Sequence, residues 1–340
     1  MENKKPLIHF FLPIGGYRGS FQGGFLYRLF KKYKDYFDIY QVDGTSIGAM
    51  NGVSIFGDIE KLKTQWYSST NTHLFPPSSD MFFVKEVVSL IKSVNTLGFS
   101  TNKKLKSLIE THDIDNLKTD KINICVVELE TGKRKYINGL NPNFKEYLVA
   151  SASPWLLVPP TKIDGKHYTD GGLLDRFSIK YIDESKADIK LLIGYDTGCD
   201  NPTYFIGDNI LTYAQNLIEI ASIKNIRDDI ETIKKLEKAN ELIVIETFFD
   251  SNYELTSKTI NEKMLIDSFK KGEYEADKFA KKYLNIVETV ETVESDETDE
   301  TAETDETDET DETDETDETD ERGKNGKKDL KTYLQKIFKK

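Results

Sequence analysis

The stretch that decides the fold is Asp38-Ile-Tyr-Gln-Val-Asp-Gly-Thr-Ser-Ile-Gly-Ala-Met-Asn-Gly52. It opens with a short, mostly apolar run, which predicts a β-strand, and it closes with small residues, which predict a closely packed helix. Between them, Gly44-Thr45-Ser46-Ile47-Gly48 has the G-x-S-x-G pattern of a sharp turn from strand to helix. The sequence therefore predicts a strand, turn and helix unit with Ser46 at the turn.

Two interpretations of Ser46 are compatible with this pentapeptide. In the first, Ser46 is a nucleophile whose hydroxyl lies at the carboxyl end of a strand and at a positively polarised helix N-terminus, with Gly44 and Gly48 allowing the strained turn. In the second, the turn is only structural and Ser46 caps the helix. The pentapeptide alone does not separate the two.

Strands and helices alternate on both sides of this unit. A buried strand is predicted at Leu7–Ile14, a glycine loop follows it, and a helix is predicted at Ser20–Tyr33. Such alternation predicts an α/β fold in which a mostly parallel sheet is covered on both faces, with ligand sites at the carboxyl ends of strands. Further strands are predicted at Ile122–Leu129, Lys133–Ile137, Lys190–Tyr195 and Leu242–Ile245, and further helices at Asn102–Thr111, Ile210–Ala239 and Asn261–Leu284.

A serine nucleophile needs a base, and the usual histidine has no suitable position in this chain. The α/β-hydrolase order is serine, acid, then a late histidine, whereas the histidines are His9, His73, His112 and His167. A partly buried carboxylate can serve instead. Asp170-Gly171-Gly172 is the best candidate, and its alternative interpretation is an ordinary turn, as is expected for Asp164-Gly165.

The loop Gly15-Gly16-Tyr17-Arg18-Gly19 lies between the first strand and the first helix. Its backbone N–H groups would point at an anion near a helix N-terminus. Nucleotide phosphate is one such anion, but the G-x-G-x-x-G spacing of a dinucleotide fold is missing. Arg18 either supplies a charge that attracts phosphate or orients the loop, or it bonds carbonyl groups at the sheet edge.

These three motifs, in this order, resemble those of the patatin-like phospholipase family, which uses a Ser–Asp dyad without histidine. The resemblance covers roughly Leu7 to Leu284. Ile14, Arg176 and Ser178 differ from the residues common in the family, and the last two lie in a turn after the aspartate motif. Other matching stretches are Arg18-Gly19-Ser20-Phe21-Gln22-Gly23-Gly24-Phe25-Leu26, Ala150-Ser151-Ala152-Ser153-Pro154 and Pro159-Pro160.

The resemblance implies a three-layer α/β/α sandwich and a lipid acyl hydrolase that acts on lipid or phospholipid esters through an acyl-serine intermediate. It implies neither a cofactor nor a metal ion. Two other functions remain open: a lipid-binding or scaffolding protein of the same fold, and an interaction module that acts through its tail. The implied site has Ser46 and Asp170 as the dyad, Gly15, Gly16, Arg18 and Gly19 at the oxyanion hole, and Gly44, Gly48, Gly171 and Gly172 in support.

The chain is predicted to have three parts: a catalytic domain at 1–290, a disordered acidic linker at 291–322 and a basic amphipathic helix at 323–340. Glu294–Glu321 holds 18 acidic and no basic residues, so it can bury no core. Within 327–340, apolar residues recur at helical spacing among lysines, which is typical of a helix on an anionic membrane surface or a partner. The alternative is that this helix folds back on the domain or the acidic tract.

Composition limits the remaining possibilities. The chain of 340 residues has no run of about 18 apolar residues and no signal peptide pattern, so a cytoplasmic or intracellular protein is expected. Peripheral attachment to a membrane is one of the alternatives for 327–340. The sequence shows no pattern of a basic groove with interleaved aromatic residues, so nucleic-acid binding is not predicted. Cys125 and Cys199 are expected as reduced, buried thiols. For the aromatic segment Leu74–Phe99 three roles are considered: it lines an acyl groove, acts as a lid or belongs to the core.

Overall fold

The computed structural model describes residues 4–72, 103–110, 117–155, 158–200, 210–247, 262–284 and 286. All of them belong to the unit Met1–Glu288. The predictions for the acidic linker, the basic helix and the aromatic segment Leu74–Phe99 concern residues outside this description.

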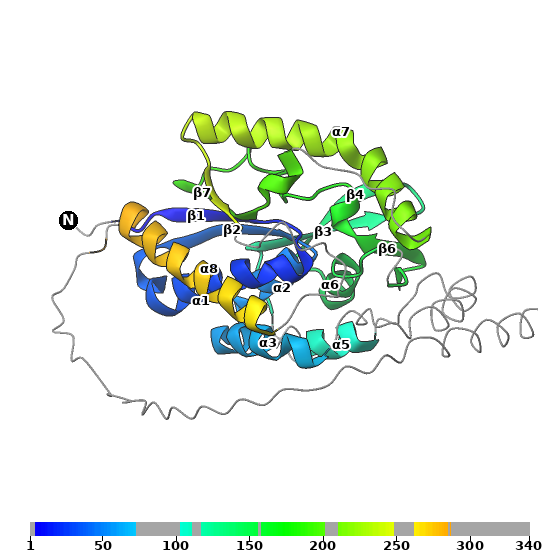
Figure 1. Cartoon of the computed structure of the whole chain (residues 1–340), viewed down its shortest axis with the longest axis horizontal. Helices are drawn as coiled ribbons and strands as arrows, with labels where there is room; N and C mark the ends of the chain where they lie inside the picture. Colours follow the sequence, from blue (N-terminus) through cyan, green and yellow to red (C-terminus); the bar gives the residue numbers. More distant parts are fainter. Residues whose placement is uncertain are drawn as a thin grey trace, which may run out of the picture. The chain divides into compact units, whose positions relative to one another are not determined.

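Within the described residues the sheet has eight strands, and five of them form a parallel run in the order β3-β2-β1-β7-β8 that reaches one end of the sheet. Figure 1 labels β3, β2, β1 and β7 of this run. This mostly parallel arrangement confirms the predicted fold class. Parallel order places the carboxyl ends of β1 and β2 side by side, with Leu12 opposite Gly44. The five strands are β1 (Leu7–Leu12), β2 (Asp38–Thr45), β3 (Ile122–Glu128), β7 (Ile189–Tyr195) and β8 (Ile243–Glu246).

An antiparallel portion extends the sheet beyond β3. β4 (Lys133–Asn138) pairs with β3, as predicted, and a hairpin of β5 (Thr161–Ile163) and β6 (Lys166–Asp170) adds two strands that were not predicted. The hairpin turns at Asp164 and Gly165, with φ angles of 49° and 83°. Both angles are in the left-handed region that such two-residue turns require, so the predicted hairpin turn is confirmed.

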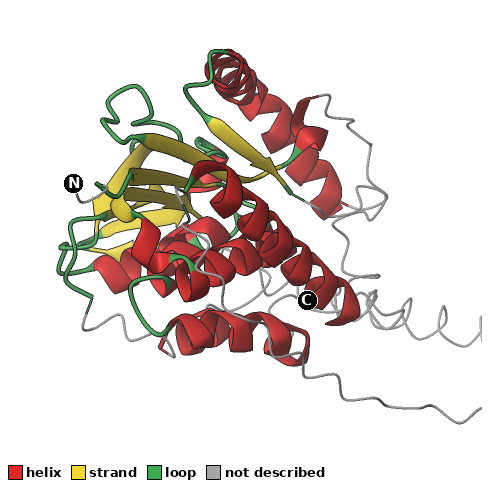
Figure 2. Ribbon diagram, turned by 90° about the vertical axis from the view of Figure 1, so that its left-hand side faces the viewer, coloured by secondary structure: helices red, strands yellow, loops and turns green. Residues whose placement is uncertain are grey.

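Helices cover both faces of the sheet and complete the predicted three layers (Figure 2). Side chains alternate along β1: Phe10 and Leu12 belong to one apolar cluster, while Phe11 belongs to the other, with residues of α7. The first face carries α1 (Gly19–Lys32), α2 (Ile47–Ser54), α3 (Ile59–Thr72), α5 (Lys103–Glu110), α6 (Phe144–Ser151) and α8 (Glu262–Tyr283), and the second carries α7 (Ile210–Lys238).

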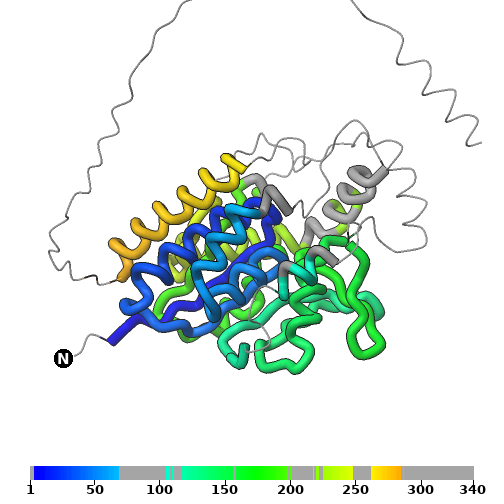
Figure 3. Tube along the Cα trace, turned by 90° about the horizontal axis from the view of Figure 1, so that it is seen from below, coloured from blue at the N-terminus to red at the C-terminus, as the bar shows by residue number. Residues whose placement is uncertain are grey.

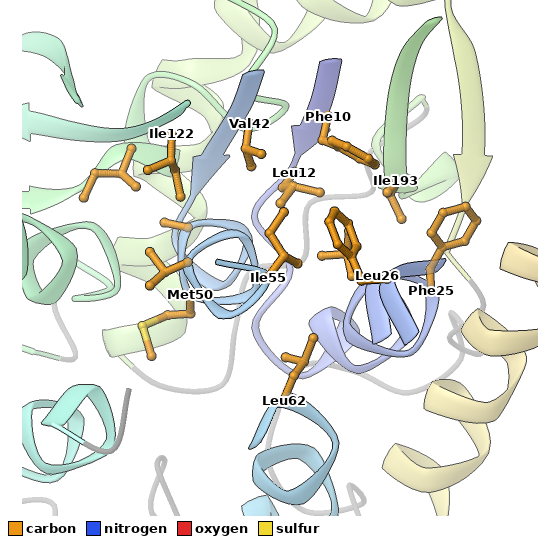
Figure 4. Close-up of a cluster of buried hydrophobic side chains, with 14 of the residues drawn as sticks. Phe10, Leu12, Phe25, Leu26, Val42, Met50, Ile55, Leu62, Ile122 and Ile193 are labelled. Atoms are coloured by element: carbon orange, nitrogen blue, oxygen red, sulfur yellow. The ribbon is translucent and has the colours of Figure 1, made fainter. Parts of the chain in front are cut away.

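The core on the first face holds the two strands that lead to the candidate site. Figure 4 shows Phe10 and Leu12 of β1 beside Val42 of β2, with Leu26 of α1 packed against them. The side chains of Phe10, Leu12, Leu26 and Val42 are fully buried. Because close-packed interiors resist small displacements, this cluster fixes where β1 and β2 end.

Helices α1 and α8 lie side by side because glycines allow their backbones to approach closely (Figure 3). A Cβ on Gly24 would lie 1.9 Å from the carbonyl oxygen of Phe269, and a Cβ on Gly272 would lie 2.0 Å from that of Phe21. Larger residues at either position would force the helices apart. The contact anchors α1, whose first residue is Gly19 of the glycine loop.

Candidate active site

Ser46 lies at a strained turn between β2 and α2. Its φ and ψ angles are 57° and −124°, a conformation that few non-glycine residues adopt and that clusters at functional sites. A Cβ on Gly44 would lie 2.8 Å from the backbone nitrogen of Ala49, and one on Gly48 would lie 2.1 Å from the carbonyl oxygen of Leu12. The two motif glycines are therefore required by close backbone contacts on both sides of Ser46.

Strand β3 brings Asp170 to Ser46. β4 occupies one edge of β3 from Asn123 to Glu128, so β2 and β6 share the other edge. On that edge Thr45 is paired with Cys125, and Asp170 is paired with the next residue, Val126. The last residue of β2, Thr45, and the last residue of β6, Asp170, therefore lie next to each other along β3. Because Ser46 directly follows Thr45, this pairing places Ser46 beside Asp170.

The side chain of Ser46 is a neighbour of the Asp170 carboxylate and acts to lower its pKa, as a hydrogen-bonding partner does. The carboxylate accepts a hydrogen bond from the backbone N–H of Gly172, at 2.8 Å, and the Asp170 side chain is buried. Burial raises the pKa of Asp170 to about 7, while Ser46, the hydrogen bond from Gly172 and the charge of Arg176 act in the opposite direction. A carboxylate with this pKa can accept a proton near neutral pH.

This raised pKa predicts how activity depends on pH. Asp170 must be ionised to take a proton, so kcat/KM for a neutral ester should rise with pH and level off above about 7. Initial rates with a soluble short-chain ester, measured in a pH-stat between roughly pH 5 and 9, check this. A rate that stays flat across this range, as an ordinary aspartate pKa of about 4 would give, would contradict the assignment of Asp170 as the base.

The glycine loop approaches the turn from the other side. It contains a short 3-10 helix, η1 (Gly16–Arg18), and Gly16 has a φ of 52°. A Cβ on Gly19 would lie 2.4 Å from Cγ1 of Ile47, so the loop packs directly on the residue after Ser46. The N–H groups of Arg18 and Gly19 are hydrogen-bonded inside the loop, whereas those of Gly15 and Gly16 have no acceptor among the described residues.

The side chain of Arg18 forms an ion pair with Asp196, just after β7. Among the roles considered for Arg18, the ion pair fits the one in which its charge orients the loop. The partner of Arg18 is the carboxylate of Asp196 and not a carbonyl group at the sheet edge. The pair connects the glycine loop to the neighbouring parallel strand on the side away from β2.

The glycine loop also contacts the loop that follows Asp170. A Cβ on Gly172 would lie 2.7 Å from Cγ2 of Ile14, and the N–H of Ile14 donates to the carbonyl oxygen of Arg176 at 2.9 Å. Gly171 is equally confined, because a Cβ there would lie 2.4 Å from the carbonyl oxygen of Cys125. All three sequence motifs therefore meet at one place.

Ser151 is a residue of the site whose part the sequence did not indicate. Its hydroxyl accepts a hydrogen bond from the backbone N–H of Ser46, at 3.1 Å, and donates one to the carbonyl oxygen of Cys125, at 2.8 Å. It is fully buried and so fixes the turn at Ser46 to β3. In the sequence, the stretch Ala150–Pro154 shows only a family-like pattern, and nothing in it signals this contact.

The described histidines have partners other than the serine. His9 bonds with Asp43 and Ser185, and His167 bonds with Glu130. His73 and His112 lie outside the described residues. Cys125 is buried, and burial raises the pKa of its thiol. Within the described ranges, no group of histidine, cysteine, aspartate or glutamate side chains is arranged to hold a metal ion.

Residues 15–183, which include all three motifs, match the family model described as patatin-like phospholipase. The chain carries a patatin-like phospholipase domain. The resemblance seen in the sequence is thereby confirmed, and the family supports lipid acyl hydrolysis as the general class of activity. The matched residues extend from the glycine loop to just after the turn that follows Asp170.

Among solved structures, the chain is similar to the crystal structure of VipD from Legionella pneumophila, with 14% identity and a TM-score of 0.36. The match covers 82% of this chain and 67% of that chain. A comparison with curated proteins found no match. Of the helices in the described ranges, none combines the length and the apolar character needed to cross a bilayer.

Proposed function

We propose that the patatin-like domain is a serine lipid acyl hydrolase of phospholipase A type that acts through Ser46 and Asp170. One observation carries the proposal: the strained turn at Ser46 is brought beside a buried carboxylate, Asp170, whose pKa is raised to about 7 by burial. A lipid-binding protein without turnover has no need for this strained, desolvated pair.

The reaction would proceed by two acyl transfers. Asp170 takes the Ser46 proton as Oγ attacks the ester carbonyl carbon, and the N–H groups of Gly15 and Gly16 bind the oxyanion. The tetrahedral intermediate then expels the alcohol, which takes the proton from Asp170. Water attacks the acyl-serine with Asp170 again as base, and its proton passes to the leaving Oγ of Ser46 as the fatty acid departs.

The direct test is fatty-acid release from a panel of substrates: phospholipid micelles of several headgroups, triacylglycerol emulsion and a p-nitrophenyl ester. The proposal predicts release from at least one phospholipid. Activity on the soluble ester alone would reduce the assignment to a general esterase. No release from any substrate would contradict the proposal.

We further propose that the basic segment 327–340 attaches the protein to anionic membrane surfaces, which brings the patatin-like domain to its substrate. The support is its sequence: Arg322–Lys340 has 8 basic and 1 acidic residues, with apolar residues at helical spacing. An intracellular location likewise remains a prediction from the sequence.

Vesicle binding tests this attachment. Deleting 323–340 is expected to lower co-sedimentation with vesicles that contain phosphatidylserine by about tenfold or more, because charge and apolar burial are lost together. Binding of the full chain should weaken as salt rises and should be low on neutral phosphatidylcholine vesicles. Equal binding of full and shortened chains would favour the fold-back alternative and contradict membrane attachment.

A further inference from the structure

Ser178 lies in the turn after Asp170 and makes contacts that no sequence motif indicated. Its side chain is fully buried, although its φ angle is 60°. The Ser178 hydroxyl donates to the carbonyl oxygen of Leu12, at 2.9 Å, and lies 2.8 Å from Oγ1 of Thr45. One hydroxyl thus joins the end of β1 to the end of β2.

The proton positions in this contact follow from the chemistry of its members. A carbonyl oxygen can only accept, so the single hydrogen of the Ser178 hydroxyl is directed at Leu12. Thr45 must then be the donor in the bond between the two hydroxyls. The three groups form a chain, from Thr45 to Ser178 to Leu12, in which each hydrogen has one acceptor.

The backbone of the same turn is tied to the aspartate motif. The Ser178 N–H donates to Oδ1 of Asp175 at 2.8 Å, and the Asp175 N–H donates to the carbonyl oxygen of Gly171 at 2.9 Å. The next carbonyl, that of Arg176, accepts from the N–H of Ile14. Asp175 is buried, which raises its pKa to about 6. Ser178 therefore has a fixed position relative to Asp170.

We infer that Ser178 is a positioning residue that sets the distances between the nucleophile, the base and the glycine loop. Thr45 directly precedes Ser46, and Leu12 lies three residues before Gly15. Through these two bonds the Ser178 hydroxyl connects the segments that carry all three functional groups, while touching neither Ser46 nor Asp170. This inference rests on the proposed function.

The backbone conformation shows that the hydroxyl, rather than the turn alone, is what this position requires. Glycine adopts a φ of 60° at little cost, whereas a serine there is strained. If the turn needed only this backbone conformation, glycine would provide it with less strain than serine. Here a serine occupies the strained position, and its oxygen makes both contacts between strands.

Two substitutions separate positioning from stability. Ser178→Gly removes the hydroxyl but relieves the strained φ, whereas Ser178→Ala removes the hydroxyl and keeps the strain. We expect both to lower kcat for ester hydrolysis by about 10-fold to 100-fold with little change in KM, because small misplacements of reacting groups are costly. We also expect Ser178→Gly to have a higher Tm than Ser178→Ala.

The outcomes are distinct. If kcat fell only in the variant with the lower Tm, and Ser178→Gly kept the wild-type kcat, then Ser178 would have a purely structural role. That result would contradict the inference. Thr45→Val should lower kcat similarly, and its effect should not add to that of Ser178→Gly, because both remove the same chain of bonds. Additive effects would also contradict the inference.

Ser185→Ala is the matched control. The Ser185 hydroxyl bonds with Nδ1 of His9 at 2.9 Å, in the half of β1 away from the glycine loop, so this variant loses a serine hydrogen bond outside the site. Its Tm should fall while kcat stays unchanged. A wild-type protein without any ester hydrolysis contradicts the proposed function and this inference with it, whereas an active wild type with an equally active Ser178→Gly contradicts the inference alone.

Discussion

Ser46→Ala is expected to lower kcat for fatty-acid release by roughly 10⁶-fold, since the oxygen that forms the acyl intermediate is removed. The effect should be on chemistry and not on folding. Alanine keeps a Cβ at the same strained φ of 57°, and the turn retains the hydrogen bond from its backbone N–H to Ser151. The Tm should therefore stay close to that of the wild type.

The measurement is fatty-acid release from phospholipid micelles by both proteins, purified in parallel. A residual rate within about tenfold of the wild type would mean that another group, or bound water, carries the reaction. Loss of activity together with a large fall in Tm would instead show that Ser46 is needed for the fold.

Asp170→Asn is expected to lower kcat by about 10⁴-fold while preserving the shape of the site. The asparagine side chain can still accept the hydrogen bond from the N–H of Gly172, but it cannot take the proton of Ser46. The rate should also lose its dependence on a group with a pKa of about 7.

The same substitution should not destabilise the protein, and its effect on stability depends on pH. The folded-state pKa of Asp170 is raised from 3.8 to about 7, so folding favours the protonated carboxyl. The stability contributed by this group is full below about 4 and is lost as pH rises through about 7. The introduced asparagine cannot ionise, so Asp170→Asn should become more stable than the wild type over this range, by up to roughly 4 kcal/mol.

Asp164→Asn is the matched control for Asp170→Asn. It makes the same chemical change in the hairpin that leads to β6, at an exposed turn residue with a φ of 49°, a conformation that asparagine tolerates. Its kcat and Tm should match those of the wild type. Activity in Asp170→Asn equal to that in Asp164→Asn would rule out Asp170 as the base.

Much of the sheet was predictable because β1, β3 and β7 are largely buried and rich in apolar residues. β1, β3 and β7 were predicted to within two residues at each end. The hairpin of β5 and β6 was not predicted, because strands of three and five mostly polar residues are too short to show the alternation of apolar and polar residues that marks a strand. Only its turn at Asp164 and Gly165 had a local signal.

The candidate site was predicted as three motifs but not as a geometry. The glycines at 44, 48, 171 and 172 reflect close contacts that only the folded chain reveals. The ends of β2 and β6 pair with consecutive residues of β3. This arrangement could not be read from the sequence, because it depends on pairing between segments that are far apart in the chain. The parts of Ser151 and Ser178 are invisible for the same reason, since a single hydroxyl has no pattern until its distant partners are known.

The most direct test of the dyad is labelling with a fluorophosphonate, which reacts with activated serine hydroxyls and needs no knowledge of the lipid substrate. We predict one covalent label per chain, located by mass spectrometry on Ser46, absent in Ser46→Ala and formed much more slowly in Asp170→Asn. A wild-type protein that stays unlabelled, or one labelled on a different serine, would contradict the assignment of Ser46 as the nucleophile.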